Sequence, residues 1–315
     1  MDEKAEEKKE DQSKEGAVRD LGDPKNLFDL IYNAKNIEET KPDITRHLQG
    51  LIDNSPLREK YSFLFLWDDA DQINRYTANQ IYAALSGKKG NEKQDILLIL
   101  YSLGGLIEPA YLISKCCQEY TKDKFIIAVP GQAKSAATLL AMGADEIHMG
   151  LMSELGPIDP QIGRYPALGL GEAVRYLASL CKTYPESSEM FAKYLSLSLD
   201  LRYLGYLERV AQSAVQYAQR LLKNKQLPTG QTAGMIAERL VYGYKDHNFV
   251  IDREEAEFLL GKSFVKGDSA EYHFADSVHK FLGRASLAFR VFKKTDFKII
   301  GDLDSGIGLV TRKEP

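Results

Sequence analysis

The most constraining feature of this sequence is a continuous apolar run that leads into a pair of glycines. Residues 96–100 read Ile-Leu-Leu-Ile-Leu, and Gly104 and Gly105 follow after three further residues. An unbroken apolar run of this length, bounded by turn signals, is typical of a strand that is covered on both faces, as in a parallel sheet. The remaining chain must therefore supply helices for both faces of a sheet.

A second buried strand and a serine follow the same pattern. Residues 125–129 are again apolar throughout, and Ser135 stands at the beginning of a helix predicted over 135–142. Strands and helices alternate in this part of the chain, which favours a parallel sheet with right-handed crossovers. The glycine pair and Ser135 should then lie at the carboxyl ends of neighbouring strands, which is where open α/β sheets bind ligands.

Shorter strand and helix patterns occupy the rest of the chain. We expect strands over residues 62–67, 146–149, 249–251, 297–300 and 307–310. Apolar residues at helical spacing predict helices within residues 24–57, 73–85, 107–117, 189–223 (interrupted at Gly205), 233–242, 253–260 and 274–292.

Composition excludes several classes of protein. The net charge of −4 gives no reason to expect nucleic acid as a partner. No apolar run reaches the length of an integral membrane segment and the N-terminus does not read as a signal peptide, so we expect a soluble, cytoplasmic protein. The three cysteines are odd in number, which predicts free thiols. Residues 1–24 are charged and almost free of apolar side chains, which predicts a disordered tail.

Ser135 permits two interpretations. Small residues surround it, and the free amides in the first turn of a helix can stabilise an oxyanion. Serine is equally a favoured helix N-cap, and small residues can simply let helix and sheet pack closely. Gly104 and Gly105 carry the same ambiguity, because glycines permit a turn as well as a close approach to a ligand. The residues by themselves leave both interpretations open.

An ordered set of motifs resembles a known family. The motifs are Ser102-Leu-Gly-Gly105, Val129-Pro-Gly-Gln-Ala-Lys-Ser135-Ala-Ala-Thr138, Ala144-Asp-Glu-Ile147 and Leu155-Gly-Pro-Ile-Asp-Pro-Gln161. They resemble the serine dehydrogenase proteinase family, which belongs with the Clp-type proteases, signal peptide peptidase A and the crotonases. The resemblance covers roughly residues 60–265 and is densest over 96–166; a long ordered motif set is poorly explained by chance.

The resemblance implies an α/β fold of the Clp and crotonase type, a spiral of ββα units. We expect this domain to span residues 25–265, with a helical insert at about 186–225. Residues 266–315 would then be a C-terminal appendage of helix and strands, for which oligomerisation is one role. The superfamily commonly forms homo-oligomers, often trimers or hexamers, so a homo-oligomer is expected here as well.

The resemblance also assigns roles to individual residues. It makes Ser135 the nucleophile and places the N–H groups of Gly105 and Ala136 in the oxyanion hole. Gly104 and Asp159 would bind substrate, and Asp159 could instead orient a base. No motif predicts a cofactor or a metal. In particular, a phosphate loop lacks its first glycine, and the histidines form no zinc-ligand pattern with the cysteines.

The general base is the least defined part of this site. Clp-type proteases supply a histidine about two dozen residues after the serine, where this chain has the loop containing Asp159. Signal peptide peptidase A uses a lysine further along, which makes Lys182 and Lys193 candidates, although a lysine on a helix is ordinarily solvated. His247 is the alternative, because imidazole is the commonest general base, and it can equally be an exposed turn residue.

The expected function is that of a serine peptidase-like hydrolase acting on a peptide or protein substrate. Two alternatives stay open. An inactive protein of the same fold could use the cleft to bind a peptide or partner, which the missing histidine favours. A crotonase-like acyl-CoA enzyme would share the oxyanion hole without needing the serine.

Overall fold

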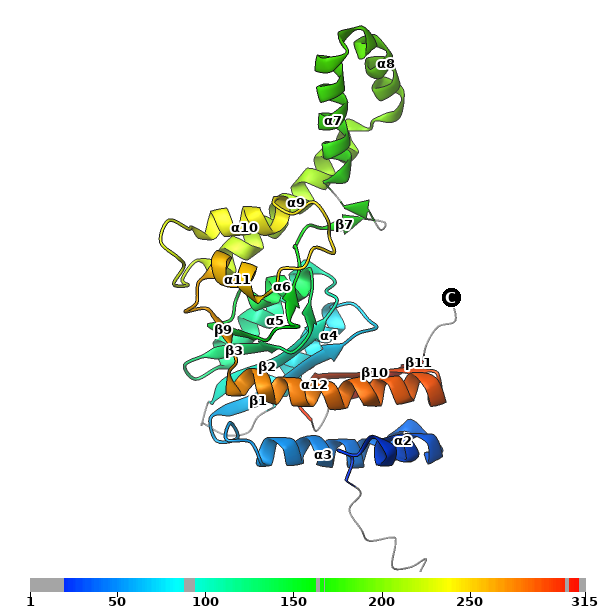
Figure 1. Cartoon of the computed structure of the whole chain (residues 1–315), viewed down its shortest axis with the longest axis vertical. Helices are drawn as coiled ribbons and strands as arrows, with labels where there is room; N and C mark the ends of the chain where they lie inside the picture. The colour runs from blue at the N-terminus through cyan, green and yellow to red at the C-terminus, as the bar shows by residue number, and fades with distance from the viewer. Residues whose placement is uncertain (1–19, 88–93, 163–164, 167, 304–305, 312–315) are drawn as a thin grey trace, which may run out of the picture.

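The computed structural model describes residues 20–87, 94–162, 165–166, 168–303 and 306–311. Most of the predicted N-terminal tail, residues 1–19, lies outside the described residues. Within the described part of the chain, the core is a nine-stranded sheet in which most neighbouring strands run parallel (Figure 1). The buried parallel sheet predicted from the apolar runs is therefore confirmed.

The strands follow one another across the sheet in the order β11-β10-β1-β2-β3-β5-β9. The parallel members are β1 (Tyr61–Asp68), β2 (Asp95–Ser102), β3 (Phe125–Val129), β5 (Glu146–Met149) and β9 (Val265–Gly267). Two short strands, β4 (Gln132–Ala133) and β6 (Glu154–Leu155), pair with each other beyond the end of β3, and β4 also pairs with β2. A separate hairpin joins β7 (Gln161–Ile162) to β8 (Tyr165–Pro166).

Helices cover both faces of the sheet, because alternate residues of each central strand point to opposite sides. Leu64, Leu66 and Leu98 belong to one core, while Phe65, Trp67 and the remaining alternate residues belong to the other. The first core is closed by α4 (Arg75–Ser86), α5 (Ile107–Tyr120), α6 (Ala136–Ala141), α10 (Ala233–Tyr242) and α11 (Arg253–Leu260). The second is closed by α2 (Pro24–Asn33), α3 (Lys41–Asp53) and α12 (Ala270–Ala288).

The C-terminal segment packs within this same unit. After α12, a π-helical turn (Phe289–Lys293) leads to β10 (Thr295–Gly301), which pairs antiparallel with β1, and β11 (Ile307–Thr311) forms the edge. Figure 1 shows α12 lying along the sheet, with α2 and α3 on its outer side. The role of this segment in oligomerisation stays a prediction.

The helical insert is longer than predicted and breaks at another place. It comprises α7 (Gly169–Thr183), a short 3-10 turn (Pro185–Ser187), α8 (Ser188–Ser198) and α9 (Leu201–Leu222). The expected interruption at Gly205 is wrong, because α9 runs through that residue. The break precedes α9 instead, where the Asp200 side chain accepts N–H groups of the first turn and caps the helix.

Two histidines take part in the packing around the sheet. His148 is buried on β5, with Nδ1 2.6 Å from the Ser269 hydroxyl and Nε2 3.3 Å from the Glu146 carboxylate. His279 on α12 accepts the indole N–H of Trp67 through Nδ1 at 2.9 Å. Burial lowers the pKa of both imidazoles, and the neighbouring carboxylates offset this only in part.

These histidines should make the fold sensitive to mild acid. The unfolded chain binds their protons near pH 6.5, whereas the folded chain binds them only at lower pH. Stability is therefore complete above pH 6.5 and is lost as the pH falls below it, by at most about 1.4 kcal/mol per pH unit for each histidine. Urea unfolding between pH 8 and pH 5 would measure this slope. The His279→Gln variant should flatten the profile, and an unchanged slope would contradict the assignment.

Candidate active site

Ser135 stands at the head of α6 in a backbone conformation that serine rarely adopts. Its φ is 50° and its ψ is −117°, outside the extended region in which helix-capping residues sit. Its side chain accepts no capping hydrogen bond from the first turn of the helix. A non-glycine residue in such a region costs on the order of 1–3 kcal/mol. The structure therefore contradicts the interpretation of Ser135 as a helix cap.

Gly104 packs directly against this serine. A Cβ atom built on Gly104 would lie 2.6 Å from the Lys134 carbonyl oxygen and 2.8 Å from the Ser135 Cβ, and the φ of Gly104 is 100°. Both its conformation and its surroundings therefore require glycine. The predicted meeting of the glycine pair and Ser135 at one end of the sheet is confirmed for Gly104.

Gly105 is held by Ile73, a residue that the apolar spacing had placed on a helix. Ile73 donates its N–H to the Gly104 carbonyl at 2.8 Å, and its carbonyl accepts the Leu106 N–H at 2.8 Å. In a parallel bridge of this kind, the central residue turns its own N–H away from the partner strand. The Gly105 N–H therefore points to the side on which β4 and Ser135 lie, and no acceptor for it is found among the described residues.

Ala136 supplies a second free amide beside Ser135. It is the first residue of α6, so its N–H has no partner within the helix. None of the described residues accepts this N–H, and its nitrogen would lie 3.1 Å from a Cβ on Gly104. The N–H groups of Gly105 and Ala136 are thus both available next to the serine, where the resemblance implies an oxyanion hole.

The structure brings together His247 and Asp159, whose pairing the sequence did not predict. His247 lies after α10, and its Nδ1 is 2.8 Å from Oδ1 of Asp159, 88 positions earlier in the chain. The Asp159 side chain is only 8% exposed, and its other oxygen accepts the amide of Gln161 at 2.9 Å. His247 is 24% exposed, so it is not the freely solvated turn residue that the local sequence allowed.

The loop that carries Asp159 is attached to the serine helix. Leu155, at the start of this loop, pairs with Ala133 of β4 on one side and with Ile251 on the other. The strand expected over 249–251 is reduced to this single bridge. The Thr138 hydroxyl donates to the Ala133 carbonyl at 2.6 Å and accepts the Gly156 N–H at 3.0 Å. The Thr of the Ser-Ala-Ala-Thr motif therefore fixes the loop against α6.

None of the described residues contacts the serine as a general base. Within the described part of the chain, Ser135 Oγ forms no hydrogen bond with any residue, His247 included. Catalytic hydrogen bonds are often long in a ligand-free enzyme and tighten when substrate binds. Lys134 is not a candidate, because its Nζ bonds Glu154 at 2.7 Å and the Leu155 carbonyl at 3.2 Å.

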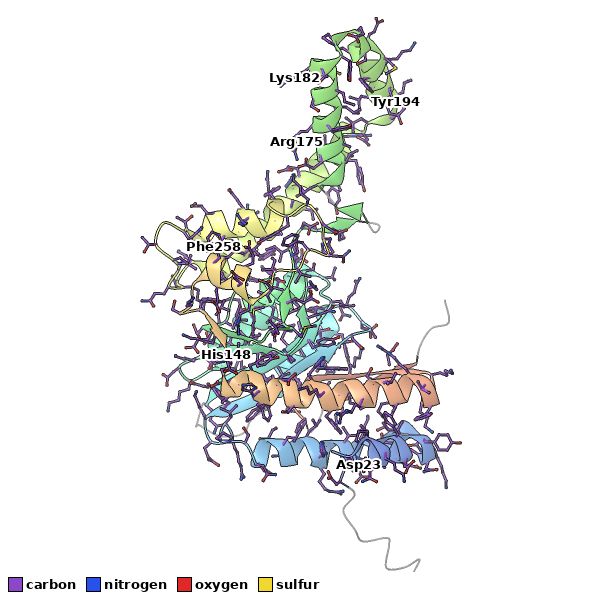
Figure 2. The ribbon with its side chains drawn as sticks, in the orientation of Figure 1. Asp23, His148, Arg175, Lys182, Tyr194 and Phe258 are labelled. Atoms are coloured by element: carbon purple, nitrogen blue, oxygen red, sulfur yellow. The ribbon has the colours of Figure 1, made fainter. Side chains whose placement is uncertain are left out.

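The lysine candidates lie elsewhere. Lys182 is exposed on α7 near the tip of the helical insert, far from the sheet (Figure 2). Lys193 is on α8 in the same insert. The structure therefore brings neither lysine to Ser135 within one chain.

A charged contact that the sequence did not predict holds the segment just before Ile73, the residue that bridges to Gly105. Asp68 ends β1, and its carboxylate accepts the N–H groups of Ala70 and Asp71, in the loop that leads to Ile73, at 3.0 and 2.9 Å. Lys298 of β10 bonds Asp71 at 2.6 Å, which anchors this loop to the C-terminal part of the sheet. The cluster of aspartates is visible in the sequence, but its basic partner more than 200 residues away is not.

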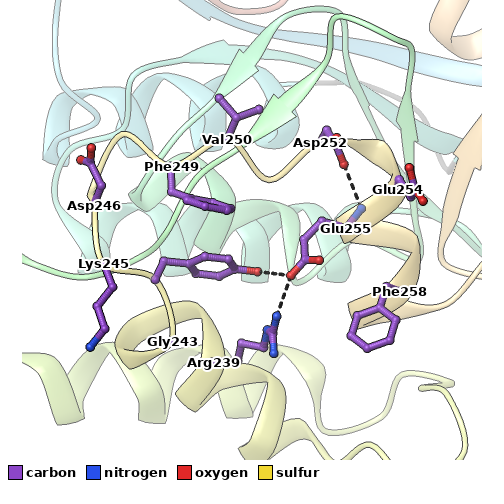
Figure 3. Close-up of a pocket in the computed structure, with 11 residues that line it drawn as sticks. Arg239, Gly243, Lys245, Asp246, Phe249, Val250, Asp252, Glu254, Glu255 and Phe258 are labelled. Atoms are coloured by element: carbon purple, nitrogen blue, oxygen red, sulfur yellow. Dashed lines mark hydrogen bonds and ion pairs between the residues drawn. The ribbon is translucent and has the colours of Figure 1, made fainter.

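An open pocket of about 780 Å³ is lined by residues that precede and follow His247 in the sequence. Its wall includes Tyr244, Phe249 and Phe258 together with the carboxylate of Glu255 (Figure 3). Glu255 accepts the Tyr244 hydroxyl at 2.7 Å and the Arg239 guanidinium at 3.0 Å. Burial and this carboxylate raise the pKa of Tyr244 to about 12, so its hydroxyl remains a donor at neutral pH.

Comparison with known proteins agrees with the motifs. Residues 72–179 match the family of ClpP-like SDH-type serine proteinases, which confirms the resemblance. The uncharacterised protein MJ1495 of Methanocaldococcus jannaschii is 29% identical over 158 residues, which are 50% of this chain and 48% of that protein. MJ0137 of the same organism is 42% identical over 77 residues, 24% of this chain and 27% of the relative. The chain thus spans about half the length, or less, of these curated relatives.

Among solved structures, the chain is similar to those of one protease. Two variants of the 1510-N membrane-bound stomatin-specific protease, one in complex with a substrate peptide, each give a TM-score of 0.42. Their sequences are 17% and 16% identical to this chain. The matches cover 72% and 80% of this chain, and 84% and 87% of the protease chains. In the described part of the present chain, none of the helices has the length and apolarity that a membrane crossing needs.

Proposed function

We propose that this chain, which matches the ClpP-like SDH-type serine proteinases over residues 72–179, is a serine peptidase-like hydrolase. The observation that carries the proposal is the state of Ser135. It keeps a strained conformation without capping its helix, and beside it lie two backbone N–H groups that no described residue accepts. Strain of this kind persists where function requires it. A packing role alone does not explain the strain at Ser135.

In this proposal the Ser135 hydroxyl attacks the carbonyl carbon of a peptide bond. The carbonyl oxygen then gains negative charge and accepts hydrogen bonds from the N–H groups of Gly105 and Ala136. Such preorganised donors lower the barrier because they do not have to reorient when the charge develops. The pocket around Tyr244 and Phe249 is open and partly aromatic, which suits an apolar side chain of the peptide.

His247 is the general base in this proposal. The Asp159 carboxylate holds Nδ1, so Nε2 is the nitrogen that takes the serine proton and later protonates the leaving amine. The buried carboxylate also stabilises the imidazolium that forms after proton transfer. Substrate binding is expected to bring Nε2 within hydrogen-bond distance of Ser135 Oγ.

The His247→Gln variant should react about 100-fold more slowly than the wild type with a fluorophosphonate probe, because a general base typically contributes 10²–10⁴-fold. Asp159→Asn should slow the reaction too, since it removes the charge that orients the imidazole. His273→Gln is the matched control, because His273 is exposed on α12 and its Nε2 contacts the exposed Asp268 carboxylate at 2.7 Å. An unchanged rate in His247→Gln would exclude this histidine as the base.

Labelling of the intact protein tests the proposed function itself. Incubation with a fluorophosphonate followed by peptide mass spectrometry should place the adduct on Ser135. If the folded protein never reacts there and no peptide is cleaved, the peptidase proposal is wrong.

Among the described residues no base bonds Ser135 Oγ, which favours one second candidate, an inactive protein that binds a peptide or partner in the same cleft. Peptide binding without labelling would identify that case. A thermal shift with acyl-CoA but not with peptides would instead indicate the crotonase-like alternative. A cytoplasmic location and assembly into a homo-oligomer belong to the proposal as well.

A further inference from the structure

One short segment, residues 243–250, carries both the proposed base and a wall of the pocket. His247 contacts Asp159 at 2.8 Å, whereas Tyr244 and Phe249 line the pocket of about 780 Å³. The remaining wall belongs to α10 and α11. A ligand in this pocket therefore lies against the same segment that holds the base.

The order of the strands places this wall close to the serine. Ile251 directly follows the segment and pairs with Leu155. Leu155 pairs in turn with Ala133 of β4, two residues before Ser135. Neighbouring strands are about 4.8 Å apart, so the wall lies roughly 10 Å from β4. An extended peptide rises about 3.3 Å per residue, so a side chain about three residues from the bond that Ser135 attacks can reach the pocket.

The walls of the pocket are apolar and largely uncovered. Phe249, Val250 and Phe258 are 45%, 52% and 63% exposed. Figure 3 shows Phe249 and Phe258 on opposite sides of Glu255. An exposed apolar patch with a charged rim marks a binding site. The volume falls within the roughly 300–1,000 Å³ of sites that hold drug-sized ligands, so there is room for more than one side chain.

Carboxylates outnumber cations in the lining of this pocket. Both lining cations already have partners, because Arg239 bonds Glu255 at 3.0 Å and the Lys245 Nζ lies 3.7 Å from Glu172, which is outside the pocket. Three further carboxylates of the lining have no ion-pair partner among the described residues: Asp246, Asp252 and Glu254. The pocket therefore has an excess of negative charge.

We propose that this pocket selects a basic side chain, arginine or lysine, in the peptide substrate, beside the apolar side chain that the aromatic wall accepts. Arginine and lysine combine a long apolar stem with a cationic head. The stem packs against Phe249 and Phe258, and the head faces Glu254. The face of an aromatic ring also attracts a cation directly. This inference rests on the proposed peptidase function and specifies its class of substrate.

Fluorescence-quenched peptides that differ at one position test this selection. In a parent peptide with one apolar residue, the positions on either side are filled in turn with arginine, lysine, glutamine or glutamate. At one of these positions kcat/KM should be at least about tenfold higher with a basic residue than with glutamine, because a hydrogen bond to a charged group is worth that much. Glutamate should be the poorest. Cleavage with equal rates for basic residues and glutamine at every position would overturn the proposal.

Glu254 is the residue to change, because its carboxylate accepts no hydrogen bond from any other described residue. Glu254→Gln should lower the ratio of kcat/KM between the basic and the glutamine peptides about tenfold. Glu254→Lys should reverse the preference towards the glutamate peptide, which a loss of stability alone would not do. Glu238→Gln is the matched control, since Glu238 is exposed on α10 and does not line the pocket. A basic preference that survives Glu254→Lys would contradict the proposal.

Peptide binding to the Ser135→Ala variant separates this proposal from the peptidase function. Fluorescence polarisation should give a Kd about tenfold lower for the basic peptides than for the glutamine peptide, and adding Glu254→Lys should remove the difference. If this preference is found but Ser135 of the wild type never reacts, the peptidase proposal is wrong and the pocket assignment stands. Cleavage without any such preference would reject the pocket assignment alone. A protein that binds none of the peptides would reject it as well.

Discussion

Replacing Ser135 with glycine is expected to stabilise the protein and to abolish its proposed hydrolysis. Glycine adopts positive φ without steric cost, so the variant releases strain on the order of 1–3 kcal/mol. Part of that gain is offset, because glycine loses more chain entropy on folding, by roughly 0.5–1 kcal/mol. We therefore expect a net gain of about 1 kcal/mol in urea unfolding. Loss of the nucleophile should lower the hydrolysis rate by a factor of about 10⁴ or more.

The Ser135→Ala variant is the matched control for this experiment. It removes the same hydroxyl and keeps a Cβ, so activity should be lost equally while the strain remains. A serine that capped α6 would instead make both variants less stable than the wild type, because alanine at an N-cap costs about 1 kcal/mol and glycine a few tenths. A Ser135→Gly protein that is less stable than the wild type would therefore restore the cap interpretation.

Replacing Gly105 with alanine should damage both the fold and the site. A Cβ at this position would lie 2.4 Å from both the nitrogen and the oxygen of Ile73, and the φ of Gly105 is 149°. These are backbone atoms in two hydrogen bonds, so they cannot move away as the end of a flexible side chain can. We expect a loss of about 3 kcal/mol in the free energy of unfolding. Alanine keeps the N–H but displaces it, so the labelling rate of the folded fraction should fall towards the about 10²–10³-fold loss that follows removal of one oxyanion donor.

Gly283→Ala provides the comparison for Gly105→Ala. Gly283 lies within α12, and a Cβ built on it meets nothing within 4 Å. Alanine there should stabilise the helix by roughly 0.5–1 kcal/mol and leave the labelling rate unchanged. If Gly105→Ala is as stable and as reactive as the wild type, the proposed role of the Ile73 bridge is wrong.

Local patterns in the sequence predict much of this fold. The apolar runs at residues 96–100 and 125–129 coincide with β2 and β3, because a strand buried on both faces needs an apolar residue at every position. Helices α10 and α11 match the predicted 233–242 and 253–260, where Thr232 and Asp252 cap the first turns. In each of these cases the signal lies within the element itself.

Contacts between distant segments could not be predicted in this way. Ile73 has the spacing of an apolar helix face, but it forms a strand bridge to Gly105, which only the folded chain brings near. His247 and Asp159 each had an ordinary structural explanation alone, and their pairing depends on the return of α9 and α10 to the sheet. Apolar periodicity shows which face of an element is buried, but not which partner buries it.

The helical insert is a further case in which sequence patterns did not predict the structure. Gly205 was expected to interrupt a helix because glycine costs about 1 kcal/mol in a helix interior. The cap at Asp200 decided the boundary instead, and α9 tolerates the glycine. Helical spacing also cannot reveal that none of the apolar residues of α8 would be fully buried within one chain.

The position of β10 has a consequence for the synthesis of the protein. β1 lies between β2 and β10, and β10 begins at Thr295, so the ribosome has to make residues 69–294 before β1 gains its second neighbour. Until then, the growing chain exposes an unpaired strand edge that contains Phe65 and Trp67. Exposed apolar edges recruit other strands. A nascent chain stalled before Thr295 should therefore aggregate or require a chaperone, whereas a chain that includes β10 closes this edge.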